Sequence, residues 1–165
     1  MKKTLLIAAA SLLAVGAITL LTAGDATKAA PEYAPLKQAT DRFMAAVCKG
    51  GPTKEAFHAF LETWWGRADE AAVKAASLAR SYDSSQSTME SHVGKRVRGE
   101  YEFLGTSQLG KSVLKLLYFE KREYSPIPWA FVFYRAETEW KLSVITVGDA
   151  AHDDMPPLGL HEPAK

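Results

Sequence analysis

Hydrophobic and polar residues alternate over most of the C-terminal half of the chain, from residue 99 to residue 149. This period of two is typical of half-buried strands, and the stretch is rich in aromatic and β-branched residues. Short turn-like stretches divide it, so the pattern predicts three or four long antiparallel strands. In chain order they are GEYEFLGTSQL, SVLKLLYFEKREY, PWAFVFYRAE and EWKLSVITVGD. We expect one sheet in sequence order, with its edges at 99–109 and Glu139–Val147.

The alternation also assigns residues to faces of the sheet. In the second strand one face carries Val113, Lys115, Leu117, Phe119 and Lys121, and the other carries Leu114, Leu116, Tyr118, Glu120, Arg122 and Tyr124. Each later strand has one apolar face, made by Trp129, Phe131 and Phe133 and by Trp140, Leu142 and Val144. If helices cover the face of Glu120 and Arg122, these two could pair in the interior or bind a ligand. The simpler interpretation is a solvated pair.

Residues with helical spacing come before the strands. The first predicted helix starts near Leu36, with Pro35 in its first turn, and ends at Gly50. The second follows Thr53 as N-cap and stops at Gly66, and it has the clearest amphipathic pattern, made by Phe57, Phe60, Leu61, Trp64 and Trp65. The third runs from 69 to about 82, with either Ala72, Val73, Ala76 and Ala79 or Leu78 and Tyr82 as its apolar side. A loop is expected at 83–87, before a short helical turn at 88–92.

The N-terminus has the composition of a targeting signal. Lys2 and Lys3 precede an uncharged apolar run from Leu5 to Leu21, and small residues follow around Gly24. We expect 1–24 to be a signal peptide, or an inner-membrane anchor through residues 5–21 if it is uncleaved. The folded part would then be periplasmic or extracellular. Residues 25–35 are interpreted as a linker, 36–149 as one α+β domain and 150–165 as a flexible tail.

Charge and cysteine content exclude several classes of protein. The chain has 165 residues and a formal charge of +1. Without Lys2 and Lys3 it has 18 basic and 19 acidic residues. No basic surface is implied, which argues against a nucleic-acid partner. The single cysteine, Cys48, excludes an internal disulfide and a cysteine-rich zinc site.

One motif points to nucleotide binding. Residues 105–112, GTSQLGKS, match the P-loop pattern Gly-x-x-x-x-Gly-Lys-Ser/Thr. A P-loop needs a helix after its lysine, because the helix N-terminus helps to hold the phosphates. The residues after Ser112 are flanked like a strand, and too few remain for further βα units. We interpret 105–112 as a hairpin turn and keep nucleotide binding as a remote alternative.

Residues suited to catalysis or metal binding do not form a recognisable set. The four histidines lack metal-ligand spacing, the Gly-x-Ser-x-Gly motif is missing, and no cofactor is implied. A lyase or isomerase would need a desolvated carboxylate, whose raised pKa lets it move protons. The strand carboxylates to inspect are Glu100, Glu102 and Glu120, with Tyr118 or Tyr134 as hydrogen-bond donors.

Helices followed by long strands that end in WAFVFYRAETEWKLSVITVGD resemble the nuclear-transport-factor-2-like superfamily. The closing pattern, Phe133-Tyr134 and Trp140-Lys141-Leu142 with Ile145, is similar to that of its small exported bacterial members. The resemblance covers roughly residues 36–149. It implies helices wrapped over a bent sheet, an internal pocket, and in some members a dimer through the outer sheet face. Members include isomerases, cyclases, dehydratases and non-catalytic binding domains.

These observations predict an α+β roll, with three helices on the concave side of a four-stranded antiparallel sheet. The first functional hypothesis is an exported, non-catalytic domain that binds an apolar small molecule or a protein, with a homodimer through the sheet face. The alternative is a small lyase or isomerase that uses a buried carboxylate. The cavity wall is expected from Phe43, Phe60, Trp64, Phe131 and Trp140. The candidate ligand-binding residues are Tyr118, Glu120, Arg122, Trp64, Phe131 and Trp140.

Overall fold

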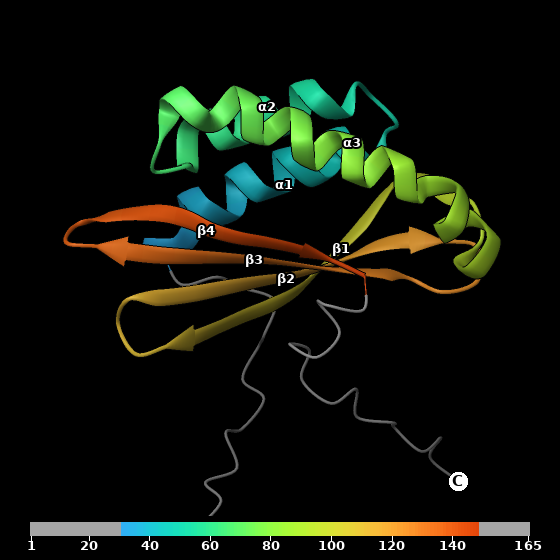
Figure 1. Ribbon diagram of the computed structural model, residues 1–165. Coiled ribbons are helices and arrows are strands. Elements are labelled where there is room, and N and C mark those ends of the chain that lie inside the picture. The colour runs from blue at the N-terminus through green and yellow to red at the C-terminus, as the bar shows by residue number, and fades with distance from the viewer. Residues whose placement is uncertain (1–30, 149–165) are drawn as a thin grey trace, which may run out of the picture.

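The computed structural model describes residues 31–148, which form three helices followed by four strands (Figure 1). A 3₁₀ turn at Pro31–Tyr33 leads into α1 (Ala34–Cys48), α2 (Thr53–Trp64) and α3 (Ala68–Val93). The strands are β1 (Arg96–Leu109), β2 (Val113–Arg122), β3 (Ile127–Ala136) and β4 (Glu139–Val147). None of the helices within 31–148 is long and apolar enough to cross a membrane. The predicted leader and tail lie outside the described residues.

The sheet is antiparallel throughout and has the order β1-β2-β3-β4, which confirms the predicted fold class and strand order. Leu109 pairs with Val113, so Gly110–Ser112 is the turn of the β1–β2 hairpin. Lys111 therefore lies in a turn between two strands, and the residue after Ser112 begins β2. The helix N-terminus that a P-loop requires does not follow this segment.

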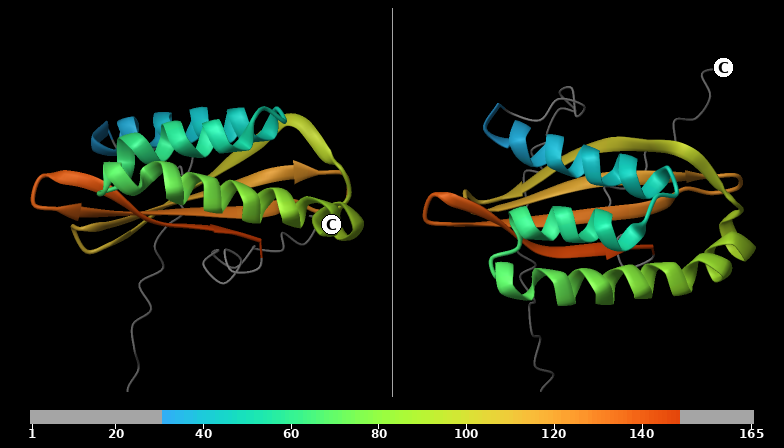
Figure 2. Two further views of the ribbon diagram at one scale, coloured as in Figure 1. Left: turned by 45° about the horizontal axis from the view of Figure 1, so that its top comes forward. Right: turned by 90° about the horizontal axis from the view of Figure 1, so that it is seen from above.

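All three helices lie on one face of the sheet (Figure 1). Seen from above, α1 crosses β1 and β2, α2 lies nearer β4, and α3 is outermost beside α2 (Figure 2). We call the covered side the inner face and the opposite side the outer face. Helix α3 can approach α2 closely because its buried side is small, made by Ala71, Ala75 and Ala79.

The core fills the space between the helices and the inner face. Phe131 is fully buried, and its ring lies within 6 Å of the rings of Phe43 and Phe60, at centroid distances of 5.6 and 5.7 Å. Trp129 and Tyr118 pack against it from the same strand and the neighbouring one. These contacts confirm the predicted division of the second and third strands into two faces, and they place the face of Tyr118 and the face of Phe131 on the inner side.

Helix α3 differs most from its prediction. It continues to Val93, so the loop expected at 83–87 is helical. Ala71 and Ala75 are buried in place of the predicted Ala72 and Ala76, and Val73 is 75% exposed, whereas Ala79 and Tyr82 are buried as predicted. Residues 83–93 are poor in strong helix formers, so their helix depends on contacts made far away in sequence. Helix α1 also starts two residues earlier than expected, at Ala34.

The fourth strand also differs from its prediction, in the face on which Val144 lies. Val132 pairs with Val144 but Phe133 pairs with Leu142, so one extra residue, Ser143, interrupts the register. A bulge of this kind shifts the following side chains to the opposite face. Val144 therefore lies on the outer face and is partly exposed, whereas Leu142 stays in the core.

The aromatic packing predicts a large cost for truncating Phe131. Phe131→Ala should lower the free energy of unfolding by about 3–5 kcal/mol, because the cavity left between two layers cannot collapse. Tyr134→Ala, on the same strand but 50% exposed, should cost less than about 1 kcal/mol. Urea denaturation of both variants checks this. Similar losses for the two would contradict the packing described.

Candidate functional site

A buried ionic cluster lies where the C-terminal half of α3 meets the sheet. Glu120 is 0% exposed and Arg122 is 6% exposed, and both point to the inner face. The interpretation of these residues as a solvated pair is therefore wrong. Because the helices cover this face, Glu120 and Arg122 pair in the interior, which is the other interpretation of their position on the strand.

The carboxylate of Glu120 is held by four side chains. Arg96 Nε donates to Oε1 at 2.8 Å, and Arg122 Nη2 forms an ion pair with the same oxygen at 2.6 Å. On the other oxygen, Tyr82 donates its hydroxyl at 2.8 Å and Trp129 its indole N–H at 3.2 Å. The four donors come from α3, β1, β2 and β3. Both carboxylate oxygens are thus fully engaged.

Arg96 extends the cluster to a further helix. Its Nη1 donates to the Val47 carbonyl at the end of α1 at 2.8 Å, and its Nη2 donates to the Tyr82 hydroxyl at 2.6 Å. Gln86 accepts from Arg96 Nη2 at 3.1 Å and from Arg122 Nη2 at 2.8 Å. Arg122 Nε and Nη1 are buried without a hydrogen-bond partner among the described residues. We call Tyr82, Gln86, Arg96, Glu120, Arg122 and Trp129 the Glu120 network.

Burial beside the network raises the pKa of two neighbouring acidic groups. Burial, reinforced by the Glu120 carboxylate, raises the pKa of Tyr82 above its usual value, so its hydroxyl remains a donor. Burial and then Glu120 raise the pKa of Cys48 to about 12. A thiol with such a pKa is neutral near pH 7, so Cys48 is a packed core residue with little reactivity.

The chemistry open to Glu120 follows from these contacts. A general base must have a free lone pair directed at the proton that it removes. Here two guanidinium groups, a hydroxyl and an indole N–H occupy both oxygens. Glu100 and Glu102, the other two carboxylates considered, are exposed and lie 3.8 Å from Lys121. None of the three carboxylates is both buried and free.

The six candidate ligand-binding residues do not meet in one place. Glu120 and Arg122 belong to the network, whereas Tyr118 donates its buried hydroxyl to Asp41 at 2.9 Å. Phe131 is in the aromatic core, and Trp140 packs edge-on against Tyr33. The expected wall of Phe43, Phe60, Trp64, Phe131 and Trp140 likewise does not enclose a common cavity.

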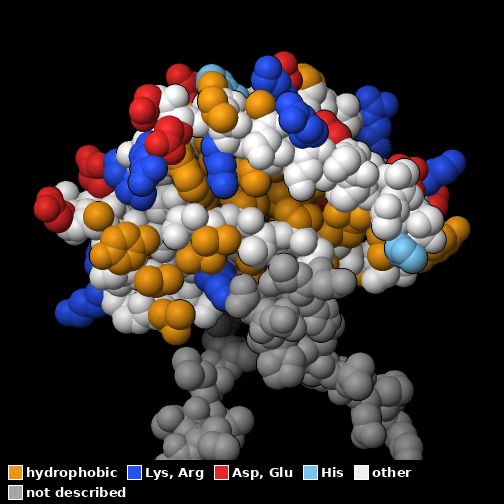
Figure 3. All heavy atoms as spheres, viewed as in Figure 1, with side chains coloured by type: hydrophobic (Ala, Val, Ile, Leu, Met, Phe, Trp, Pro, Cys, Tyr) orange, Lys and Arg blue, Asp and Glu red, His pale blue; other side chains and the backbone are white. Residues whose placement is uncertain are grey.

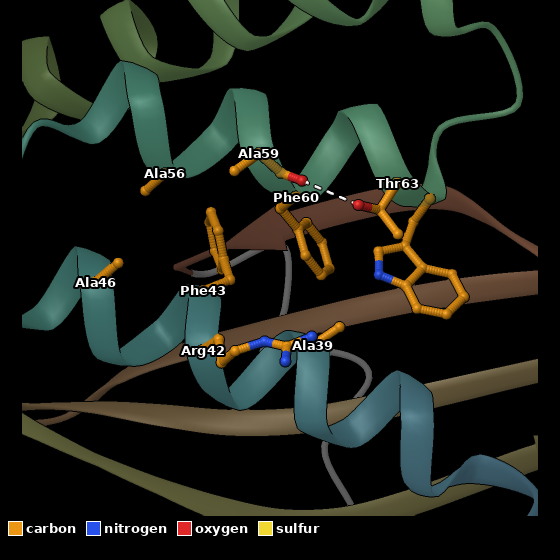
Figure 4. Close-up of a pocket in the computed structure, with 9 residues that line it drawn as sticks. Ala39, Arg42, Phe43, Ala46, Ala56, Ala59, Phe60 and Thr63 are labelled. Atoms are coloured by element: carbon orange, nitrogen blue, oxygen red, sulfur yellow. Dashed lines mark hydrogen bonds between the residues drawn. The ribbon is translucent and has the colours of Figure 1, made fainter.

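Part of that wall forms a small hollow between α1 and α2. Its volume is about 220 Å³, and Phe43, Phe60 and Trp64 line it together with Arg42 and several alanines (Figure 4). Figure 4 shows Phe43 and Phe60 pointing into the space between the helices, with Thr63 bonded to its own helix at Ala59. The hollow is bounded by two helices and is separate from the Glu120 network.

A larger groove runs between α3 and the sheet, and we call it the α3 groove. Two adjoining hollows of about 320 and 500 Å³ share Ser85, Met89 and Val147. Apolar side chains dominate the lining, and hydrophobic atoms are visible in this band below α3 (Figure 3). The apolar lining is Phe57, Leu78, Met89, Val93, Pro126, Ile127, Pro128, Ile145 and Val147. Tyr82 lines the groove and also bonds to Glu120, so the groove borders the network.

Three members of the network cannot be identified from the sequence pattern. The pattern predicts a loop at Gln86, leaves Arg96 outside the first strand, and gives Tyr82 only as an apolar residue. Arg96 and Glu120 are 24 residues apart, and Arg122 and Gln86 are 36 apart. No local pattern links residues at such separations. The available signal was the pair of charges on an otherwise apolar strand face.

Comparisons with known proteins leave the family open. No family model matches the chain, and no curated protein or solved structure matches it. Within residues 31–148, no group of three or more His, Cys, Asp or Glu side chains is arranged to hold a metal ion. The geometry of the network and the groove therefore carries the functional argument.

The network predicts that removing the charge of Glu120 destabilises the protein far more than removing the charge of an exposed glutamate. Glu120→Gln should lower the free energy of unfolding by about 3–5 kcal/mol, because two buried guanidinium groups lose their counter-charge. Glu102→Gln, an exposed glutamate near Lys121, should change stability by less than about 1 kcal/mol. Chemical denaturation measures both. Equal stabilities of the Glu120→Gln variant and the parent chain would refute the charge pairing.

Proposed function

We propose that this chain is an exported, non-catalytic binding domain whose α3 groove takes a small, largely apolar molecule. The observation that carries the proposal is the groove itself. Its larger hollow, about 500 Å³, falls within the range of small-molecule sites, which are mostly apolar with a few polar groups. Ser85, Thr88 and His92 supply such groups along one wall.

The walls of the groove favour a ligand that is flat or extended. One wall is the α3 helix with Met89, whose flexible side chain adapts to different shapes. The opposite wall is β4 and the start of β3, with Val147, Ile127 and Pro128. The groove is open to solvent along one side and has no concentration of charge. A neutral or weakly polar ligand fits this lining best.

The contacts of Glu120 favour a binding function over a catalytic one. It is the buried carboxylate that a lyase or isomerase would need, yet four donors hold it and it is not among the residues that line the groove. A proton transfer through Glu120 would require breaking ion pairs to two arginines. The network therefore supports a structural role for Glu120, which holds α3 in the position where it forms one wall of the groove.

Membership of the nuclear-transport-factor-2-like superfamily remains part of the proposal. Three helices placed before a four-stranded antiparallel sheet support it. Export rests on the N-terminal 24 residues, whose basic start and apolar run have signal-peptide composition. Because some members of the superfamily dimerise through this surface, we also propose a homodimer through the outer sheet face.

A groove of this kind should bind the dye 1-anilinonaphthalene-8-sulfonate with enhanced fluorescence. Met89→Asp should weaken the affinity about tenfold or more, because it replaces buried apolar contact with a charge. Val73→Asp is the matched control, since Val73 is on the same helix but 75% exposed. Fluorescence titration of the folded variants measures both affinities. Equal affinities for the two variants would place the dye outside the α3 groove and overturn the proposal.

A further inference from the structure

One side of the α3 groove is the edge of β4 that does not pair with β3. β4 is the last strand in the order of the sheet, so it pairs with β3 along one edge. Seen from above, α3 runs along the other edge (Figure 2). Within residues 31–148, the bridge on that other edge joins Trp65 to Leu142 in a parallel sense, just before α3 begins. We call the stretch beyond this bridge, Ser143–Val147, the β4 edge.

The backbone of Ile145 and Val147 points away from β3. In an antiparallel ladder, alternate residues direct both their N–H and their C=O to the neighbouring strand. Gly148 donates its N–H to the Pro128 carbonyl at 2.9 Å, and the same register continues to Thr146 opposite Ala130. Residues 144, 146 and 148 therefore face β3, and the N–H and C=O groups of Ile145 and Val147 lie on the β4 edge.

The sequence of the β4 edge is suited to pairing with a further strand. Sheets protect their edges against such pairing with charged side chains, proline or bulges. The opposite edge of the sheet, β1, has Arg96, Arg98, Glu100 and Glu102 and two shifts of register. In contrast, 144–147 is Val-Ile-Thr-Val, which is β-branched throughout and has neither a charge nor a proline. This end of β4 lacks the protection that β1 has.

The two hollows of the α3 groove follow one another along the β4 edge. Ile145 and Val147 line the hollow of about 320 Å³, and Val147 and Gly148 line the hollow of about 500 Å³. A strand paired with β4 places every second side chain on the inner face, beneath α3. Such side chains are about 6.7 Å apart along the strand. Two successive inward side chains would therefore enter one hollow each.

The lining of the groove selects uncharged side chains. Among the described residues that line the two hollows there is no Asp, Glu, Lys or Arg. A charged side chain would be desolvated there without an ion-pair partner, which is costly. A molecule without amide groups would fill the hollows but leave the N–H and C=O groups of Ile145 and Val147 unused. A peptide backbone is complementary to both features.

We propose that the ligand of the α3 groove is a short extended peptide that joins the β4 edge as a fifth strand. Its backbone bonds to Ile145 and Val147, and two apolar side chains, two residues apart, occupy the hollows beneath α3. Backbone bonds supply affinity and the hollows supply sequence preference. This inference rests on the proposed function, because it concerns the same groove, and it names the chemical class of the ligand.

Backbone methylation of a probe peptide tests the strand pairing in the full parent chain. The probe is acetyl-TFTLT-amide, which carries its two apolar side chains two residues apart. Two methylated forms have the same side chains: one is methylated on the amide nitrogens of phenylalanine and leucine, the other on those of the middle and last threonines. In a paired strand, alternate amides face the partner, so one form directs its methyl groups at β4 and the other directs them away.

One methylated form should bind about tenfold or more weakly than the probe, because it loses the bonds to β4, while the other stays within about threefold. The form that loses affinity also gives the direction of the added strand. Isothermal titration calorimetry measures the three affinities. Equal effects of the two methylation patterns, whether a loss or none, would overturn the fifth-strand inference, as would a probe that does not bind.

A variant of the chain locates the pairing on the β4 edge. Val147→Pro removes an N–H that β3 does not use, and proline is tolerated where the N–H of an edge strand faces outward. Val147→Ala is the matched control, since it trims the same side chain and keeps the N–H. The proline variant should bind the probe peptide about tenfold more weakly than the alanine variant. Equal peptide affinities for the two variants would contradict the pairing.

The dye 1-anilinonaphthalene-8-sulfonate separates this inference from the proposed function. Its affinity should differ by less than about threefold between Val147→Pro and Val147→Ala, because it needs the hollows and not the backbone of β4. Dye bound in the groove of a chain that does not bind the peptide would overturn the fifth strand and leave the groove as a small-molecule site. A dimer that Val147→Pro abolishes would assign the β4 edge to a second copy and overturn the peptide.

Discussion

The pairing of Glu120 with Arg96 and Arg122 is the interaction on which the arrangement of helices and strands depends. A carboxylate in this position would be strongly destabilising alone, because desolvation of an unpaired charge costs several kcal/mol. Its partners come from α3, β1, β2 and β3, and Arg96 also donates to the Val47 carbonyl in the last turn of α1. Apolar packing tolerates small shifts between layers, whereas this set of hydrogen bonds requires one relative placement.

The network also explains the shape of the proposed binding site. Tyr82 and Gln86 attach the C-terminal half of α3 to the ends of the strands, although this half has few buried apolar residues. The helix is thereby held over β4 with the α3 groove beneath it. The same contacts occupy both oxygens of Glu120, so the carboxylate that most resembles a catalytic group is committed to structure. A binding role for the groove follows more directly than proton transfer.

Much of the fold could be predicted from the sequence because its strands alternate clearly. The period of two placed Phe131 and Trp129 on one face and put Glu120 and Arg122 together. Burial of that pair could not be predicted, since it depends on which face the helices cover. The helix at 83–93 could not be predicted for a related reason: its serine-rich sequence has low helix propensity, and the contacts of Gln86, Met89 and Val93 that hold it are made with distant parts of the chain. The bulge at Ser143 has no sequence signal and moved Val144 to the outer face.

We infer that the Glu120 network, more than apolar burial, holds residues 83–93 as a helix. Amide hydrogen exchange in an Arg96→Met variant tests it directly, because this change keeps an apolar stem and removes the donors to Val47, Tyr82, Gln86 and Glu120. Exchange across 83–93 should accelerate about tenfold or more relative to the parent chain, while α2 keeps its protection. Equal acceleration in both helices, or none in 83–93, would contradict the account.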